Sequence, residues 1–345
     1  MIGINLKSRH VRRFGIGAVG LAVIVATFAF VLPRIADYRD VWDVVKDLSW
    51  PEIGVLMAVT ALNLATYAPP WQAALPGLNF RNAFVLSMSS SASTYLAPGG
   101  PAVGVALSYG MLRGWGFKRK DVTLAVALTG TWNQFIMLGL PSLALALLTI
   151  VGEHHALLKT VALIGLGVFV IAASSYAAGL SSRRLARWAG NSSARIVSWG
   201  LRIVRRGPVS WTGETFAGFR AQAVELLSRR WHFLTAATLA GQLTVFLVLL
   251  ACLRVFDVPA DQVTVIEAFA AWALVRLVGS IPITPGGLGI VELGLTTALV
   301  AFGGNNAGVV AAVLIYRFLT VVPTLVLGGL SALTWRSNKV VPESP

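Results

Sequence analysis

The chain has 345 residues, of which 56% are hydrophobic and only 12% are charged, about half the charged share of an ordinary soluble domain. With a mean hydropathy of +0.74, this composition excludes a soluble globular protein and predicts one polytopic membrane domain over 1–345. The net charge of +14 does not indicate nucleic-acid binding, because no recognition motif accompanies the basic residues.

Six apolar runs are long enough to cross a membrane as uninterrupted helices. They cover residues 14–32, 51–75, 122–150, 156–179, 232–254 and 307–333. The first run follows a basic N-terminus, is long for a signal-peptide core and lacks a small-residue cleavage site. We therefore expect a retained transmembrane helix there.

Two further apolar segments, 83–112 and 264–303, are each interrupted near the middle by Pro-Gly-Gly. The arms of the first segment, 83–97 and 99–112, would each form a helix about 22 Å long, less than the ~30 Å hydrocarbon core. A re-entrant hairpin is therefore expected at 83–112. The arms of the second segment are longer, which leaves the choice between a hairpin and two crossings closer there.

The distribution of Lys and Arg predicts the orientation in the membrane. With the N-terminus inside, 21 of the 28 basic residues fall in cytoplasmic segments and five in external ones. Ten are arginines of the segment 181–230, where they alternate with Trp, Ile, Val and Leu at helical spacing. This cytoplasmic loop is either an amphipathic helix pair that gathers anionic membrane lipid or a plain topology anchor. The prediction is a multi-pass protein of the cell (inner or plasma) membrane with both termini cytoplasmic.

The two interrupted segments resemble each other when they are aligned at one constant interval. The stretch "STYLAPGGPAVGVALSYG" from Ser93 aligns with "SIPITPGGLGIVELGLTT" from Ser280, with the serine and the Pro-Gly-Gly identical. Three crossings lie between the two motifs, so the second copy would be inverted relative to the first. The predicted fold is therefore an all-α inverted repeat, with a first repeat at 51–150 and a second at 232–333, an arrangement typical of transporters.

Each interruption is a candidate anion-binding site. Proline ends the incoming helix, and the glycines permit a reversal that leaves backbone N–H groups uncovered. The next helix begins with unpaired N–H groups and a partial positive charge. The candidate head-group residues of the two interruptions are Pro98, Gly99, Gly100, Pro285, Gly286 and Gly287. The serines and threonine of 87–94 either line a polar groove or let helices approach closely.

Three ionisable residues, Arg276, Glu292 and Arg317, lie deep in the apolar second half. Each needs a partner or water, because a central Arg costs about 2.5–3.5 kcal/mol even on the lenient insertion scale. Their sum of +1 suits an anionic lipid head group held by Arg276, Arg317 and Tyr316. The alternative is an ion pair that locks the hairpin to the last helix. Glu292 is expected to form a structural or gating ion pair, with proton coupling as the second reading.

Signals for other chemistry are weak. The sequence holds no P-loop and no nucleophile elbow. The adjacent His154 and His155 lack the spacing of zinc ligands, and the one cysteine, Cys252, lies in an apolar run. We therefore expect no enzyme activity, no cofactor and no metal.

The stretch "PGGLGIVELG" with a downstream "YR" resembles the membrane domain of lysylphosphatidylglycerol synthases and their standalone flippase-like relatives. The resemblance covers roughly 50–335. It implies an inverted-repeat helical membrane protein linked to the movement of a phospholipid between leaflets. The motif residues implied by it are Pro285, Gly286, Gly287, Gly289, Glu292, Tyr316 and Arg317.

Two features depart from that family pattern. No aminoacyl-transferring domain follows Trp335, so synthase activity is not expected. Many relatives carry a Glu and an Arg after the first Pro-Gly stretch, whereas Gly104–Ser108 holds neither.

The expected function is translocation of an anionic lipid by alternating access, with the head group between the two Pro-Gly-Gly tips. A phospholipid, a polyprenyl phosphate and a glycolipid each fit the residues. The alternatives are a non-transporting scaffold or regulator of a cell-envelope lipid enzyme and, third, a membrane enzyme that acts on a lipid phosphate.

Overall fold

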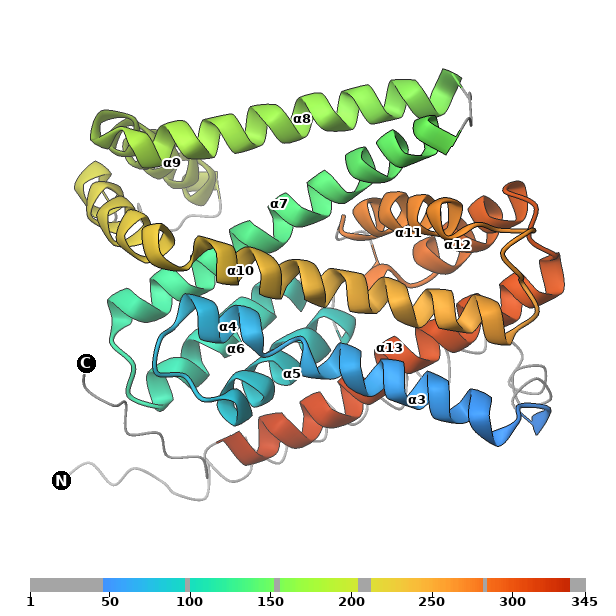
Figure 1. Cartoon of the computed structure of the whole chain (residues 1–345). Helices are drawn as coiled ribbons and strands as arrows, with labels where there is room; N and C mark the ends of the chain where they lie inside the picture. The colour runs from blue at the N-terminus through green and yellow to red at the C-terminus, as the bar shows by residue number, and fades with distance from the viewer. Residues whose placement is uncertain (1–45, 97–99, 152–155, 204–211, 282–283, 336–345) are drawn as a thin grey trace.

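The computed structural model describes residues 46–96, 100–151, 156–203, 212–281 and 284–335, and every regular element in these ranges is a helix. Figure 1 shows them in order. They are α3 (Trp50–Ala65), α4 (Pro69–Ala74), α5 (Phe80–Leu96), α6 (Gly100–Gly114), α7 (Arg119–Val151), α8 (Ala156–Ser181), α9 (Arg183–Ile203), α10 (Gly213–Val255), α11 (Val265–Gly279), the 3₁₀ turn η3 (Pro285–Gly287), α12 (Ile290–Ala301) and α13 (Asn306–Thr334).

Five helical segments of the described chain are long and apolar enough to cross a membrane, and each overlaps one of the six predicted crossings. They are Trp50–Ala74, Arg119–Thr149, Leu163–Ser181, Gly213–Val255 and Asn306–Thr334. The remaining predicted crossing, 14–32, lies outside the described residues. The chain is therefore a multi-pass, all-helical membrane protein.

The crossing predicted at 51–75 is divided into α3 and α4. Pro69 and Pro70 have no N–H to continue the hydrogen-bond ladder, so α3 ends at Ala65 and the prolines form the first turn of α4. The break frees the carbonyl of Tyr67, which accepts a hydrogen bond from Ser87 Oγ of α5 at 2.7 Å. An interrupted helix thus forms part of the interior of the bundle.

The crossing predicted at 232–254 begins much earlier. Helix α10 starts at Gly213 and has 43 residues, so it is about 64 Å long, roughly twice the hydrocarbon thickness. Its first half lies in the predicted cytoplasmic segment 181–230 and packs against α9. This segment therefore contains two helices, as its helical spacing predicts.

Two helical hairpins interlock the two halves of the chain. Hairpin 1 consists of α5 and α6, and hairpin 2 consists of α11, η3 and α12 (Figure 1). The first arm of each hairpin packs against the last long helix of the other half: α5 lies on α13, and α11 lies on α7. The tip of hairpin 2, η3, reaches α5. Helix α10 contributes to both large hydrophobic clusters of the core.

The two halves share local structure at the interval found in the sequence. Each hairpin ends in the same turn, a glycine of positive φ after which the next N–H donates back into the last turn of the helix. The glycines are Gly116 (φ 95°) and Gly303 (φ 113°), and the interval between them equals that between Ser93 and Ser280. The helices that follow, α7 and α13, begin at Arg119 and Asn306, which are separated by the same interval.

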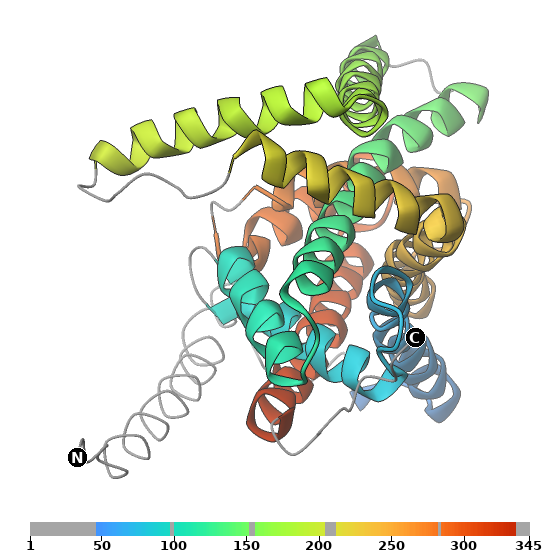
Figure 2. The ribbon, with the colours of Figure 1, turned by 90° about the vertical axis from the view of Figure 1, so that its left-hand side faces the viewer.

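Helix α8 stands at the edge of the bundle, packed mainly on α7 (Figure 2). None of the residues in its apolar stretch 163–181 is buried. An apolar helix without buried residues is stable only where lipid or another apolar surface covers it.

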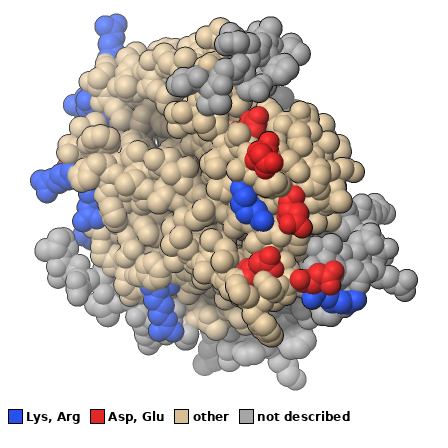
Figure 3. All heavy atoms as spheres, turned by 45° about the vertical axis from the view of Figure 1, so that its right-hand side comes forward, with Lys and Arg blue, Asp and Glu red and all other residues tan. Residues whose placement is uncertain are grey.

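Acidic side chains are concentrated at one end of the molecule and basic side chains at the other. In Figure 3 the acidic side chains gather on the side that carries the start of α3 and the loop between α10 and α11, with some basic side chains among them, and further blue side chains lie along the other edge. The acidic residues of these segments are Asp47, Glu52, Asp257, Asp261 and Glu267. The start of α7, helix α9 and the first half of α10, which are rich in basic residues, lie at the opposite end (Figure 1).

The crossing of α5 and α13 depends on a glycine, which gives a first test of the fold. A Cβ added to Gly328 would overlap Ala92 and lie 2.5 Å from the carbonyl oxygen of Met88. We expect Gly328→Ala to lower the free energy of unfolding by about 1–3 kcal/mol, because overpacking moves the backbones apart. Thermal unfolding in detergent would measure it.

The adjacent glycine is the matched control. A Cβ at Gly329 meets nothing within 4 Å, so Gly329→Ala is expected to leave the midpoint unchanged or to raise it. Equal midpoints for the two variants would contradict the close α5–α13 packing.

Candidate functional site

A cavity of about 450 Å³ lies where the two halves meet. Its wall takes residues from α5, α6 and α7 of the first half and from α10, α11 and α13 of the second, together with the break between α3 and α4. The lining is rich in hydroxyl and amide side chains and includes two arginines, Arg276 and Arg317. Polar groups are concentrated here inside an otherwise apolar bundle.

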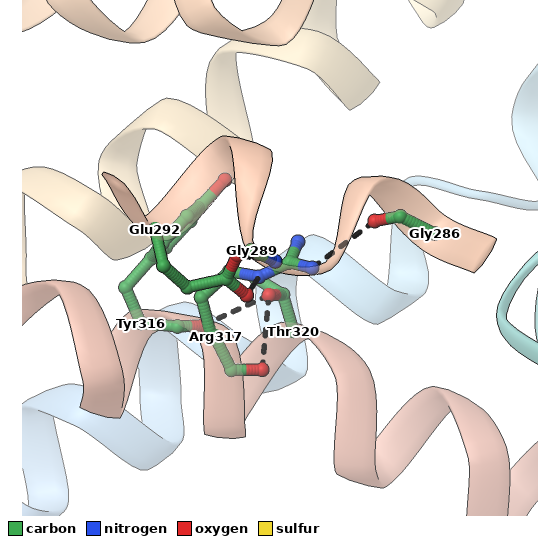
Figure 4. A network of polar contacts seen from close by, with 6 residues as sticks. All are labelled: Gly286, Gly289, Glu292, Tyr316, Arg317 and Thr320. Atoms are coloured by element: carbon green, nitrogen blue, oxygen red, sulfur yellow. Dashed lines mark hydrogen bonds and ion pairs between the residues drawn. The ribbon is translucent and has the colours of Figure 1, made fainter. Parts of the chain in front are cut away.

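Arg317 ties α13 to the tip of hairpin 2 (Figure 4). Its Nε donates to Glu292 Oε1 at 2.6 Å, and its Nη2 donates to the carbonyl oxygen of Gly286 at 3.0 Å. The side chains of Arg317 and Glu292 are only 12% and 7% exposed, so the ion pair is almost dry. Breaking either partner away would leave an uncompensated buried charge.

The local sequence explains why Glu292 sits at this point. Gly286, Gly287 and Gly289 adopt φ of 61°, 67° and 83°, a region that side chains disfavour, and they turn the chain into α12. Glu292 is the third residue of α12, and its Oε2 accepts the N–H of Gly289 at 2.7 Å. Its other oxygen remains for Arg317.

Arg276 is held by a relay of amides that crosses three helices. Its Nε donates to Gln242 Oε1 of α10 at 3.1 Å, and Gln242 Nε2 donates to Asn133 Oδ1 of α7 at 2.7 Å. The guanidinium lies 5.4 Å from the centre of the Trp272 ring, within range of a cation–π contact. Among the described residues, no carboxylate forms an ion pair with Arg276.

The predicted charged and aromatic residues come together at the cavity. Arg276, Tyr316 and Arg317 all line it, and Glu292 holds Arg317 from behind. The predicted alternatives for Arg317 thus coexist, since the side chain is both ion-paired and part of the wall.

The tip glycines are placed differently from the expectation. Gly100, Gly286 and Gly287 do not line the cavity. The N–H of Gly287 donates to the Thr284 carbonyl and that of Gly289 to Glu292, so the anion at this helix start is the protein's own carboxylate. Pro98 and Gly99 lie outside the described residues, and Pro285 belongs to η3. Lipid contact at these tip residues stays a prediction.

Both readings of the serine-rich arm apply to different side chains. Ser87, Ser90, Ser91 and Thr94 line the cavity, as a polar groove requires. The Ser93 hydroxyl instead lies between two carbonyl oxygens, that of Ser90 at 2.6 Å and that of Gly100 in the other arm of hairpin 1 at 3.1 Å. The small side chains also permit the close approach of α5 and α13.

Sequence reasoning missed several wall residues. Gln242 and Thr238 are isolated polar residues in the long apolar helix α10, and Tyr67 lies at the break after α3. A polar side chain in the middle of a predicted crossing was the available signal, because such residues face the bundle interior or a cavity.

Comparison with known proteins agrees with this architecture. No curated protein matches the chain. The family described as "Lysylphosphatidylglycerol synthase TM region" matches residues 17–328, which is most of the chain and includes all the described cavity residues. The family resemblance seen in the Pro-Gly-Gly and Tyr-Arg motifs is therefore confirmed. The chain is a multi-pass, lipid-related membrane protein that belongs to the family of the lysylphosphatidylglycerol synthase transmembrane region.

Proposed function

We propose that the protein moves an anionic lipid between the two leaflets of the membrane. The head group would pass through the polar cavity while the acyl chains stay in lipid. The observation that carries this proposal is the cavity itself, which presents Arg276 and Arg317 inside an apolar bundle. Membership of a lipid-related membrane family supports it, and the proposal includes no catalytic step.

The architecture proposed with this function is an inverted repeat with two re-entrant hairpins. The arms α5, α6, α11 and α12 have 17, 15, 15 and 12 residues, so the longest is about 26 Å, less than the ~30 Å core. The turns that end the two hairpins lie at the interval found in the sequence, and the first arm of each hairpin packs on a helix of the other half. Both observations support an internal repeat. Broken helices at the interface of inverted repeats suit alternating access.

The ion pair would serve as the link between lipid and gate. Arg317 holds the tip of hairpin 2 through the Gly286 carbonyl and Glu292. A lipid head group in the cavity would contact the same wall as Arg317, so the position of hairpin 2 would be linked to lipid occupancy while the ion pair stays intact.

We propose that the basic end faces the cytoplasm and that α9 rests on anionic lipid. One face of α9 packs on α10, where a Cβ at Gly190 would lie 2.8 Å from Phe216 Cγ. Another face exposes Trp188 and Trp199, at 65% and 68%. The exposed Arg184 and Arg195 flank these tryptophans on the helix, the arrangement of an interfacial helix.

Lipid exchange in reconstituted liposomes tests the proposed function. Fluorescent phosphatidylglycerol in the inner leaflet is expected to reach an external quencher faster with the protein than without it. Arg276→Gln is expected to slow exchange at least tenfold, because it removes the one described cavity cation without a carboxylate partner.

Arg229→Gln is the matched control, since Arg229 is exposed and does not line the cavity. It is expected to exchange lipid at the wild-type rate. If phosphatidylglycerol, phosphatidic acid and a polyprenyl phosphate all exchange no faster than in protein-free liposomes, the transport proposal fails and a scaffolding role is favoured.

A further inference from the structure

The cavity has a group of fixed hydrogen-bond donors around Arg276. Guanidinium only donates, so Gln242 must turn its oxygen to Arg276 and its NH₂ to the oxygen of Asn133. Asn133 then turns its own NH₂ toward Met137 Sδ at 3.6 Å, which is a weak acceptor. The remaining N–H groups of Arg276 and Asn133 are oriented donors, which is what phosphate oxygens bind.

A second set of lining groups consists of acceptors. The hydroxyls of Thr94, Thr129 and Thr238 donate to carbonyls of their own helices at 2.7, 2.8 and 2.7 Å. Ser90 does the same at 3.1 Å. With their protons used in this way, these hydroxyls offer oxygen lone pairs to a ligand. Groups of this kind bind a ligand that donates, such as a polyol.

The charge of the site limits the charge of the ligand. Arg317 and Glu292 neutralise each other at 2.6 Å, which leaves Arg276 as a single uncompensated cation among the described lining residues. A phosphodiester monoanion balances it. A phosphomonoester carries about −1.5 to −2 near pH 7 and would leave excess negative charge in the site. An added ammonium finds no carboxylate, because no Asp or Glu is among the described lining residues.

We infer that the lipid bound here is a singly charged phosphodiester whose head group ends in an uncharged polyol. The phosphate lies at Arg276 and Asn133, and the polyol hydroxyls donate to Thr129, Thr238 and their neighbours. A cavity of about 450 Å³ is within the range of small-ligand sites. This inference rests on the proposed function and separates its three candidate lipids: it rejects polyprenyl phosphates and uncharged glycolipids.

Competitive lipid binding to the purified full-length chain, measured by native mass spectrometry, tests the selectivity. The probes are phosphatidylglycerol, phosphatidic acid and lysyl-phosphatidylglycerol with the same acyl chains, and a polyprenyl phosphate. Phosphatidylglycerol is expected to be retained at least fivefold more tightly than each of the others. Equal retention of phosphatidylglycerol and phosphatidic acid would overturn the inference.

The double variant Thr129→Val/Thr238→Val isolates the polyol contacts, because valine keeps the shape and removes the acceptor. Phosphatidylglycerol affinity is expected to fall about 5- to 25-fold, roughly fivefold for each lost hydrogen bond, with phosphatidic acid affected less than twofold. The control is Thr123→Val on the same helix, whose exposed hydroxyl makes the same bond to the Arg119 carbonyl at 2.8 Å. Equal losses for both lipids would contradict polyol recognition.

Arg276→Gln tests the charge argument. The variant is expected to bind phosphatidylglycerol more weakly. Its preference for phosphatidylglycerol over lysyl-phosphatidylglycerol is expected to fall below twofold, because the cation that repels the lysyl ammonium groups is gone. An unchanged preference would assign the selectivity to other residues and overturn this part.

Binding and exchange separate the two claims. Selective binding without exchange would leave the inference standing and remove the transport function. Exchange of all anionic lipids at one rate, without a binding preference, would leave transport standing and remove the inference. Thermal unfolding of each variant confirms that the chain is folded when it is measured.

Discussion

The variant Arg317→Gln is expected to unfold at a much lower temperature than the wild type and to give no lipid exchange between the leaflets. The ion pair with Glu292 is 2.6 Å long and nearly dry, so removing the cation leaves a buried carboxylate without compensation. Such a loss costs about 3–5 kcal/mol. The tip of hairpin 2 also loses its tie to α13 through the Gly286 carbonyl.

The double variant Glu292→Gln/Arg317→Gln separates stability from transport. Removing both charges avoids the unpaired carboxylate, so most of the stability is expected to return, because no buried charge is left without a partner. Exchange of phosphatidylglycerol is expected to stay abolished, because the guanidinium on the cavity wall is still missing. Thermal unfolding and liposome exchange on the same preparations measure the two effects.

An exposed pair of the same chemistry serves as the control. Arg183 and Glu214 form an ion pair at 3.3 Å with side chains 65% and 60% exposed. Arg183→Gln is expected to change neither the unfolding midpoint nor exchange, because exposed pairs add little. If the double variant exchanged lipid at the wild-type rate, Arg317 would be structural only.

The sequence predicted the membrane-crossing elements because hydropathy is a local property. Five predicted crossings reappear as helical segments, and the interrupted segments 83–112 and 264–303 became hairpins 1 and 2. Two of these crossings are not a single helix over the apolar run alone, for physical reasons. Helix α10 continues to Gly213 because helix formation does not stop where hydropathy falls, and α3 ends early because of the Pro69-Pro70 pair.

The charged part of the site and the hydroxyls of the serine-rich arm could also be predicted, whereas the pairing of the amide side chains could not. Arg276, Glu292 and Arg317 were identifiable because a charge in an apolar run is costly and must have a reason. The contact of Gln242 with Asn133 joins residues 109 positions apart, and only the tertiary structure brings them together.

The two halves of the chain contribute different groups to the cavity. When the chain is aligned on itself with Ser93 over Ser280, the positions that match Arg276, Glu292 and Arg317 hold Ser89, Val105 and Gly130. Of these three, Val105 and Gly130 line the cavity. The second half therefore supplies the charges, and the first half supplies space and the hydroxyls of hairpin 1 and α7. Under the proposed function, lipid selectivity would depend on both halves, although the charged lining residues come from only one of them.

The tip of hairpin 2 packs against Tyr95, a residue of α5 in hairpin 1. Gly286 has φ 61°, and a Cβ there would overlap the Tyr95 ring, 2.7 Å from Cε1. Gly286→Ala is therefore expected to lower the free energy of unfolding by about 1–2 kcal/mol through backbone strain and by about 1–3 kcal/mol more through the clash with the ring. Exchange of phosphatidylglycerol is expected to fall at least tenfold, because the tip that carries the Arg317 contact is displaced.

Gly289→Ala is the control for strain alone, since Gly289 has φ 83° but nothing within 4 Å of an added Cβ. Its free energy of unfolding is expected to fall only by the contribution of backbone strain. In a Tyr95→Ala background, Gly286→Ala is expected to cost no more than Gly289→Ala, because the ring it would strike is absent. A double-mutant cycle without coupling between Gly286 and Tyr95 would show that these two residues do not touch in the working protein. Coupling would instead tie the closure of the cavity to a contact between the two halves, so that opening hairpin 2 requires Tyr95 of hairpin 1 to move as well.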